Sequence, residues 1–254
     1  MLTIKESAAV LKLPFIRNNY EDSLKEAHVK DMTHEEFLRS VLNSEVELRS
    51  SNGIRNRIKN AHFPNRILLE DYRRDHLSTE VNTMIRELET LEFIENRQIV
   101  ILIGNPGTGK TALATALGMK ACIEGKNVIF ISIPTLLIEL KEAMNQNQIL
   151  KYRSRFEKYD LCILDEFGYC SFDKERGEIL FNLLSSRNEK GAMIITSNLT
   201  FDRWNEIFND TVLTGAIIDR LSFESYLIDM SGESYRTLAT RKWQESRFGK
   251  SETI

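Results

Sequence analysis

The sequence predicts an α/β protein, in which a mostly parallel sheet of five strands is covered by helices on both faces and follows a small all-α segment. Helical patterns alternate with short apolar segments, as expected when parallel strands are joined by crossover helices. Residues 1–66 instead show helical patterns with few β-branched runs. We therefore expect two domains, a helical one over 1–66 and the α/β one over 67–254. The expected strands span residues 99–104, 127–133, 161–166, 192–198 and 225–230.

Length and composition are those of an ordinary water-soluble protein. A chain of 254 residues can bury a core in the α/β domain and still carry the smaller domain. The formal net charge is −3, so any contact with nucleic acid must come from local basic surfaces. Lys5, Glu6 and Lys12 interrupt the apolar residues of the N-terminus, which is unlike a signal peptide, and the apolar runs are too short to span a bilayer. We expect a cytoplasmic protein with no membrane contact.

The three cysteines, Cys122, Cys162 and Cys170, form no C-x-x-C pair and lie within or beside apolar segments. This placement favours buried structural thiols over a redox or metal role. It also fits a reduced, cytoplasmic protein.

The helical segment carries recognisable start and stop signals. Thr33 lies three residues before Glu36, which is the spacing of a capping box. Asn52 and Gly53 predict the end of the helix that starts there. Residues 54–63 then predict a short further helix that ends before Pro64. The apolar positions of the first helix recur at helical spacing, at Phe37, Val41, Leu42, Val46 and Leu48.

A phosphate-binding loop is the strongest signal in the chain. The stretch "GNPGTGKT" over residues 104–111 follows an expected strand and precedes an expected helix, the context that a P-loop requires. Its glycines let consecutive backbone N–H groups face the phosphates, and the helix N-terminus adds its dipole. Lys110 would neutralise the β and γ phosphates of ATP, and the Thr111 hydroxyl would bind Mg²⁺. The expected nucleotide contacts are Gly104, Asn105, Pro106, Gly107, Thr108, Gly109, Lys110, Thr111 and Ala112.

The segment "LCILDE" supplies the second half of this chemistry. Four apolar residues predict a buried strand, and Asp165 at its end would hold Mg²⁺ through water. Glu166 is placed to orient and activate an attacking water. The alternative is a surface carboxylate pair at a strand end. Asp165 followed by Glu166 favours water as the acceptor, and therefore hydrolysis over transfer to a small molecule.

Two further polar residues extend the expected catalytic set. Asn198 ends the strand "AMIITSN", where its amide can reach the γ-phosphate or the water, although an asparagine in this place is also a common turn former. Arg220 follows an amphipathic helix. It is either a solvated residue or partner of Asp219, or an arginine finger that reaches the active site of a neighbouring subunit.

Together these motifs resemble the IstB family, ATP-binding helper proteins of insertion-sequence transposition. The resemblance covers residues 33–240, and its motifs, in chain order, are "GNPGTGKTALATALG", "LCILDEFGY", "MIITSN", "FDRWNEIFND", "AIIDRL" and "GESYR". The family is related to the DnaC helicase loaders, and both are AAA+ ATPases. The resemblance implies a sheet order of 5-1-4-3-2, ATP-driven assembly of subunits on DNA, and delivery of target DNA to a transposase.

The resemblance also implies roles for individual residues. Lys110 and Thr111 take the Walker A positions, and Asp165 and Glu166 take the Walker B positions. Asn198 matches sensor 1, Arg220 matches the arginine finger, and Arg236 in "GESYR" matches a nucleotide-sensing arginine. Only a short segment follows "DRL", so the helical lid of many AAA+ proteins is expected to be truncated.

Two clusters of basic residues are candidates for DNA phosphate contacts. The first lies between Glu47 and Glu70, where no acidic residue occurs, and the second lies between the second and third strands. Solvated helices are the alternative for both. Neither cluster predicts base readout, so we expect double-stranded DNA to be bound largely independently of sequence. The candidates are Arg49, Arg55, Arg57, Lys59 and Arg66 in the first cluster, and Lys151, Arg153 and Arg155 in the second.

These residues bear on three possible functions. The preferred one is an ATP-dependent helper of insertion-sequence transposition that self-assembles on DNA and acts with its cognate transposase. A DnaC-like loader of a replicative helicase is the alternative, with the helical domain gripping the helicase. A small-molecule kinase would need an acceptor pocket, and the set Asp165, Glu166, Asn198 and Arg220 argues against it.

Overall fold

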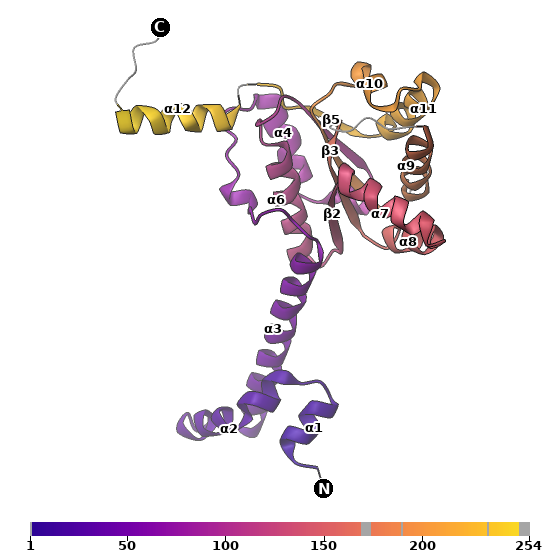
Figure 1. The fold of residues 1–254 in the computed structure, drawn as a ribbon. Helices are drawn as coiled ribbons and strands as arrows, with labels where there is room; N and C mark the ends of the chain where they lie inside the picture. The colour runs from indigo at the N-terminus through magenta and orange to yellow at the C-terminus, as the bar shows by residue number, and fades with distance from the viewer. Residues whose placement is uncertain (1, 169–173, 189, 233, 249–254) are drawn as a thin grey trace. The chain divides into compact units, whose positions relative to one another are not determined.

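The fold is that of a computed structural model, which describes residues 2–168, 174–188, 190–232 and 234–248. Contacts divide the chain into two compact units, Met1–Asn56 and Arg57–Ile254. The first unit is built from helices alone, and the second contains the sheet (Figure 1).

The first unit consists of α1 (Ile4–Val10), α2 (Pro14–Val29) and most of α3 (His34–Asn60). The capping box predicted at the start of α3 is confirmed. The Thr33 backbone N–H donates to Glu36 Oε2 at 2.8 Å, and the Glu36 N–H donates to Thr33 Oγ1 at 3.3 Å. Glu45 of α3 is buried and accepts a hydrogen bond from the backbone N–H of Ile16, which ties α3 to the start of α2.

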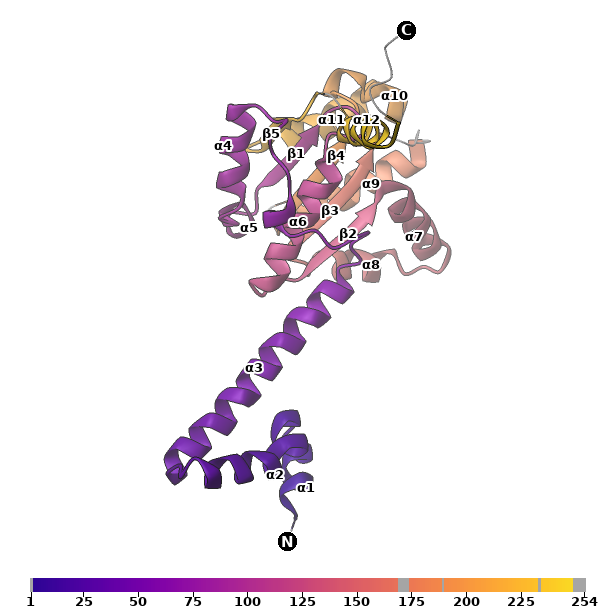
Figure 2. The same cartoon turned by 90° about the vertical axis from the view of Figure 1, so that its left-hand side faces the viewer.

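The predicted helix stop at Asn52 and Gly53 is wrong, because α3 continues through both residues to Asn60 (Figure 2). A glycine inside a helix costs about 1 kcal/mol but does not forbid the conformation. Contacts of the last turn offset that cost: the Arg57 Nε donates to the Cys122 carbonyl at 2.8 Å, and the carbonyl of the fully buried Ala61 accepts from the Phe130 N–H. The chain leaves the helical course at His62, whose φ is +60°.

The second unit contains a five-stranded parallel sheet in the order β2-β3-β4-β1-β5. Read from the other edge this is 5-1-4-3-2, so the predicted order is confirmed. Strands β1 and β4 at the centre are wholly buried, which explains their continuous apolar sequences. The strands are β1 (Ile99–Ile103), β2 (Val128–Ser132), β3 (Leu161–Phe167), β4 (Ala192–Ser197) and β5 (Tyr226–Asp229).

Helices cover both faces of this sheet, as predicted (Figure 1). One apolar cluster joins the first face to α4 (Thr79–Leu88), α5 (Glu92–Glu95) and α6 (Lys110–Ile123). The other cluster joins the second face to a larger set: α7 (Ile133–Asn145), α8 (Ile149–Phe156), α9 (Lys174–Arg187), α10 (Asn205–Phe208) and α11 (Thr211–Ser222). Two short 3₁₀ turns, Leu69–Asp71 and Phe201–Arg203, and a final helix, α12 (Tyr235–Phe248), complete the described elements.

Buried thiols and the absence of a membrane-spanning segment were both expected from the apolar parts of the sequence. Cys122 and Cys162 are free and buried, and burial raises the pKa of the Cys122 thiol to about 11. Cys170 lies outside the described residues. In the part of the chain that the structure describes, no helix is both long enough and apolar enough to cross a bilayer.

Candidate nucleotide site

The phosphate-binding loop connects β1 to α6, and its glycines are required by close backbone contacts. Gly107 and Gly109 have φ values of +87° and +94°, in the region that favours glycine. A Cβ atom at Gly107 would lie 2.2 Å from Ser234 Oγ, and one at Gly104 would lie 2.7 Å from the Met230 carbonyl carbon. The segment after β5 therefore packs directly on this loop, and side chains at these glycines would displace it.

Lys110 is the first residue of α6 and is almost wholly buried. Its Nζ donates to the carbonyls of Gly104 at 2.6 Å and Asn105 at 2.7 Å. Burial lowers the pKa of Lys110 to about 8, although the nearby Asp165 carboxylate acts in the opposite direction. The ammonium group is thus held inside the loop, where the charge of a triphosphate would be placed.

Asp165 lies at the end of β3 and faces two hydroxyl groups. The Thr111 Oγ1 donates to Asp165 Oδ1 at 3.0 Å, and the Thr196 Oγ1 of β4 donates to the same oxygen at 2.6 Å. Hydroxyl and carboxylate oxygens are the ligands that Mg²⁺ prefers, and Mg²⁺ usually completes its shell with water and phosphate oxygens. The described residues contain no group of three or more His, Cys, Asp or Glu side chains suited to a metal.

Glu166 adopts a different conformation from its neighbour because β3 is irregular at this point. The pairing of β3 with β4 shifts register between Leu164 and Phe167, and Glu166 has a φ of +63°. Its N–H donates to Thr196 Oγ1 at 3.1 Å. This left-handed conformation is strained for a non-glycine residue, and such strain is concentrated at functional sites. As a result Asp165 stays buried while Glu166 is exposed at the sheet edge.

Asn198 follows β4 next to these carboxylates. Its Oδ1 is buried and has no hydrogen-bond partner among the described residues. A Cβ at Gly168 would lie 2.9 Å from that oxygen, so the glycine leaves the space that the amide occupies. A buried acceptor is costly when unpaired, which fits an amide that meets a water or a nucleotide.

A cavity of about 330 Å³ opens beside the loop and would accommodate the nucleoside part of ATP. Tyr72, His76 and Tyr235 line it together with loop residues. The His76 Nε2 lies 3.2 Å from the Thr108 carbonyl, and the Tyr235 N–H donates to the Gly107 carbonyl at 3.0 Å. Tyr72 is buried and its hydroxyl has no hydrogen-bond partner among the described residues, and burial raises its pKa.

The sequence did not reveal these three residues or Thr196. Tyr72 and His76 lie in a loop without a motif, and they reach the site only through the fold. Tyr235 stands beside Arg236 in "GESYR", a motif considered only for its arginine. Thr196 is a polar residue inside an apolar strand, and this departure from the apolar pattern is the feature of the sequence that could have identified it as a site residue. Arg236 belongs to α12, but its side chain lies outside the described part of the structure.

Arg220 lies at the exposed C-terminal end of α11. Its Cζ is 5.7 Å from the centre of the Phe181 ring of α9, a cation–π contact. Both helices cover the face of the sheet opposite α6, the helix that begins with Lys110 (Figure 1). The side chain is therefore presented to the outside of the subunit.

The candidate DNA contacts have different environments. In the first unit Arg49 donates to the Lys12 carbonyl, while Arg55 is exposed. In the second unit Arg153 pairs with Glu157 at 3.1 Å, and Arg57 bonds the Cys122 carbonyl. Arg57 is half-buried, and the other seven candidates, Lys59, Arg66 and Lys151 among them, are exposed.

The two basic segments meet in the second unit at a cavity of about 420 Å³, which we call the basic cavity. Arg57, Asn60 and His62 line it from the first segment, and Arg155 and Lys158 line it from the second. Asn127 and Tyr159 complete the wall, and Asp160 nearby accepts a hydrogen bond from the Asn127 N–H at 2.7 Å. Residues almost 100 positions apart thus form one surface of predominantly positive charge.

A family profile and the most similar proteins of known sequence indicate the same family. A sequence profile described as IstB-like ATP binding protein matches residues 6–243. The chain is 37% identical over 232 residues to the protein named for ATP binding in insertion sequence IS21 of Pseudomonas aeruginosa, covering 91% of this chain and 88% of that protein. It is 32% identical over 244 residues to the IS5376 counterpart of Geobacillus stearothermophilus, with 96% and 97% covered.

Solved structures share the fold. AMPPCP-bound DnaA from Aquifex aeolicus matches with a TM-score of 0.56 at 19% identity, over 76% of this chain and 58% of that chain. The crystal structure of the DnaC helicase loader matches with a TM-score of 0.55 at 20% identity, over 68% and 98%. At these identities the likeness concerns architecture alone, a P-loop domain of the AAA+ type.

Proposed function

Because the chain belongs to the IstB-like ATP-binding protein family, we propose that it is an ATP-dependent DNA-binding helper of insertion-sequence transposition. Family and fold make it an ATPase. In the proposed function, subunits assemble on target DNA in the ATP-bound state and deliver this DNA to a transposase, with ATP hydrolysis as the switch. The names of its relatives, which belong to insertion sequences, support the transposition role.

The chemistry assigned to each residue follows from the site geometry. Lys110 and the loop amides bind the phosphates, and Glu166 orients the attacking water and accepts its proton, while Asn198 holds that water. Bound Mg²⁺ would be held by Thr111 and, through water, by Asp165, and would neutralise charge on the phosphates. Tyr72, His76 and Tyr235 bind the nucleoside.

Self-assembly is supported by the position of Arg220. A phosphoryl-transfer site needs a cation at the γ-phosphate, and Arg220 is exposed on the face opposite α6. We therefore assign Arg220 to the site of a neighbouring subunit, where its charge would add to that of Lys110. The observation that carries the proposal is the exposed position of Arg220 near the end of α11, on the face opposite α6.

DNA binding is assigned to the basic cavity and the exposed cations around it. The cavity gathers guanidinium, ammonium and amide groups, which bind phosphate oxygens without reading sequence. The double variant Lys59→Gln, Lys158→Gln should bind duplex DNA more weakly, with a salt dependence whose slope falls by about one unit per lost phosphate contact.

The matched control removes the same charge elsewhere. Lys25 and Lys30 are exposed in the first unit and pair with Asp22 and Glu26. The variant Lys25→Gln, Lys30→Gln should keep the parental salt slope. An equal slope for both double variants would remove the basic cavity from the DNA-binding surface, and DNA binding that requires a replicative helicase would contradict the transposition role.

A further inference from the structure

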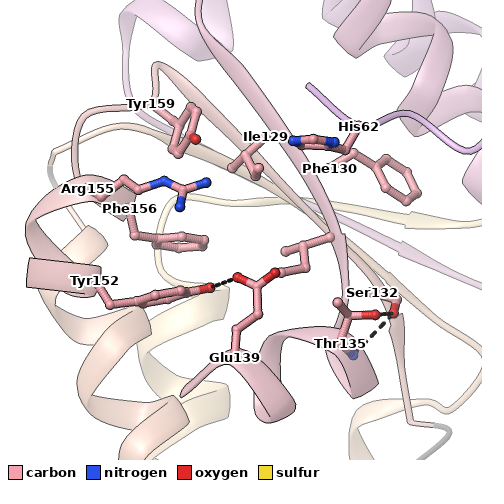
Figure 3. Close-up of a pocket in the computed structure, with 11 residues that line it drawn as sticks. His62, Ile129, Phe130, Ser132, Thr135, Glu139, Tyr152, Arg155, Phe156 and Tyr159 are labelled. Carbon is pink, nitrogen blue, oxygen red and sulfur yellow. Dashed lines mark hydrogen bonds between the residues drawn. The ribbon is translucent and has the colours of Figure 1, made fainter. Parts of the chain in front are cut away.

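A second cavity, of about 390 Å³, lies along the outer side of β2 and adjoins the basic cavity (Figure 3). The two share His62, Arg155 and Tyr159. We call the second one the aromatic cavity, and its principal lining residues are His62, Phe130, Glu139, Tyr152, Arg155 and Tyr159. The continuity means that a ligand anchored by charge in the basic cavity can extend directly into the aromatic one.

Two tyrosine rings line one side of the aromatic cavity, and the His62 ring lies on the other side. Tyr152 comes from α8, with its ring stacked on Phe156 at a centroid distance of 6.4 Å, and Tyr159 follows on the same side. His62 lies across the cavity from them, and Arg155 extends toward it from the side of Tyr159 (Figure 3). The Phe130 ring points away from the cavity and packs edge-on against Phe63 at a centroid distance of 6.2 Å. Tyrosine and imidazole rings and a guanidinium plane can stack on a flat, π-bonded ligand.

Two polar groups of opposite charge can orient such a ligand. Glu139 Oε2 accepts the Tyr152 hydroxyl at 2.8 Å, which fixes the carboxylate and leaves Oε1 as an acceptor for the ligand. Arg155 supplies donors. The other polar lining residues, Ser132 and Thr135, cap the start of α7 through their contact at 2.9 Å. A ligand that satisfies both Glu139 and Arg155 carries an amino donor beside a ring-nitrogen or carbonyl acceptor.

We propose that the aromatic cavity receives one unstacked base of the DNA whose phosphates lie in the basic cavity. This inference rests on the DNA binding proposed above. Adenine, guanine and cytosine each present an exocyclic amino group next to an acceptor, whereas the only donor of thymine is a ring N–H flanked by two carbonyl oxygens, which would repel the Glu139 carboxylate. Stacking on aromatic side chains favours any base, and Glu139 adds a preference for those with the amino group. A captured base would anchor the duplex at one point without specifying a sequence.

The test compares three duplexes of one sequence in the presence of a non-hydrolysable ATP analogue. One is fully paired, one carries a single bulged nucleotide, and one carries an abasic residue at the bulge. The abasic duplex has the same flexibility without a base. Because a bulged base is already unpaired, the protein should bind the base-bearing bulge on the order of tenfold more tightly than either of the others, with dT the weakest of the four bases.

Two variants locate the effect in the cavity. Tyr159→Leu should remove the preference for a base over an abasic residue. Glu139→Gln should abolish the disadvantage of dT, and because it removes a negative charge it cannot weaken phosphate contacts. Glu142→Gln is the matched control, since Glu142 is exposed on the same helix and does not line the cavity; it should keep both preferences.

The outcomes separate this inference from the proposed function. Equal affinity for the base-bearing and abasic bulges, with salt-dependent binding of the paired duplex retained, overturns the base-binding cavity alone. Loss of preference in Glu142→Gln as strong as in Glu139→Gln also overturns it. Absence of salt-dependent binding to all three duplexes overturns the proposed DNA binding, and the inference with it.

Discussion

The nucleotide site and the basic cavity belong to the same unit but are built in opposite ways. In the nucleotide site the charges of Lys110 and Asp165 are buried, and each is held by two or more hydrogen bonds. In the basic cavity His62, Arg155 and Lys158 are exposed. Buried charges require fixed partners, whereas exposed cations keep their water and act additively. Single substitutions should therefore abolish activity when they fall in the nucleotide site, and should only weaken DNA binding when they fall in the basic cavity.

Arg220 is the strongest test of that contrast, because it is exposed and yet is expected to have the largest effect. Arg220→Ala should bind ATP nearly normally, since its own phosphate loop is intact. DNA-stimulated hydrolysis should fall about 10³-fold or more, the usual effect of losing an arginine finger. Steady-state ATPase rates and nucleotide affinity measure the two quantities.

Mixing variants decides whether the site is shared. Lys110→Ala should lose ATP-dependent assembly, but it retains Arg220. An assembly of both variants contains some interfaces with one intact phosphate loop and one intact arginine, so hydrolysis should reappear on mixing. Normal hydrolysis by Arg220→Ala alone, or loss of ATP binding in that variant, would contradict the shared site.

Glu166→Gln addresses the exposed member of the carboxylate pair. The substitution keeps shape and hydrogen bonding but removes the group that accepts the proton of the attacking water. Hydrolysis should fall by about 10²- to 10⁴-fold while ATP binding persists, so that the protein stalls in its assembled state. Sedimentation with DNA and ATP would detect the stalled assembly. Hydrolysis at the parental rate would show that Glu166 is not the base.

The sequence predicted the parts of this molecule that depend on local pattern. The five strands and the loop around Lys110 were confirmed, because apolar runs and a glycine-rich turn constrain neighbouring residues along the chain. The strand order, which is confirmed as well, was implied by the family resemblance and not by local pattern. The predicted stop at Gly53 was wrong, since Arg57 and Ala61 make contacts with α6 and β2 that no local pattern contains.

The missed residues of the nucleotide site have the same explanation. Tyr72 and His76 precede the phosphate loop by about 30 positions and reach it only through tertiary packing. Thr196 contacts Asp165 because β3 and β4 are adjacent in the sheet, although 31 positions separate the two residues. The meeting of two basic segments in one cavity also depends on the folded edge of β2. Sites whose residues come from different helices, strands and loops can be identified only once the fold is known.

Thr196 offers an intermediate test. Thr196→Val keeps the shape of the side chain but removes the hydroxyl that bonds both Asp165 Oδ1 and the Glu166 N–H. The bond to Asp165 is the one that orients the carboxylate, and loss of one such buried hydrogen bond costs about 1–3 kcal/mol, so the Mg²⁺ concentration needed for half-maximal hydrolysis should rise roughly tenfold. Thr214→Val is the control, because Thr214 is equally buried and its hydroxyl bonds only the Asp210 carbonyl of its own helix. An equal effect in both variants would assign Thr196 to stability alone.

The smallest expected effect comes from the protonation of Lys110. Burial lowers its pKa to about 8, and the phosphates of ATP favour the charged form, so bound ATP should raise that pKa again. Below pH 8 the lysine is already charged and affinity should be insensitive to pH. Above pH 8 binding must take up a proton, so affinity should fall as pH rises, by about fourfold between pH 7 and pH 8.5.

The stability of the ATP-free protein should change in the opposite direction over the same range. The unfolded chain holds this proton up to the ordinary lysine pKa of 10.5, so unfolding takes up a proton between pH 8 and pH 10.5, and the contribution of Lys110 to stability rises with pH. The proton uptake that accompanies ATP binding can be measured directly, by titration calorimetry at pH 8.5 in two buffers of different ionisation enthalpy. Binding should take up roughly three-quarters of a proton there and almost none at pH 7. Equal proton uptake at pH 7 and pH 8.5 would show that the Lys110 ammonium is not the group whose pKa the phosphates raise.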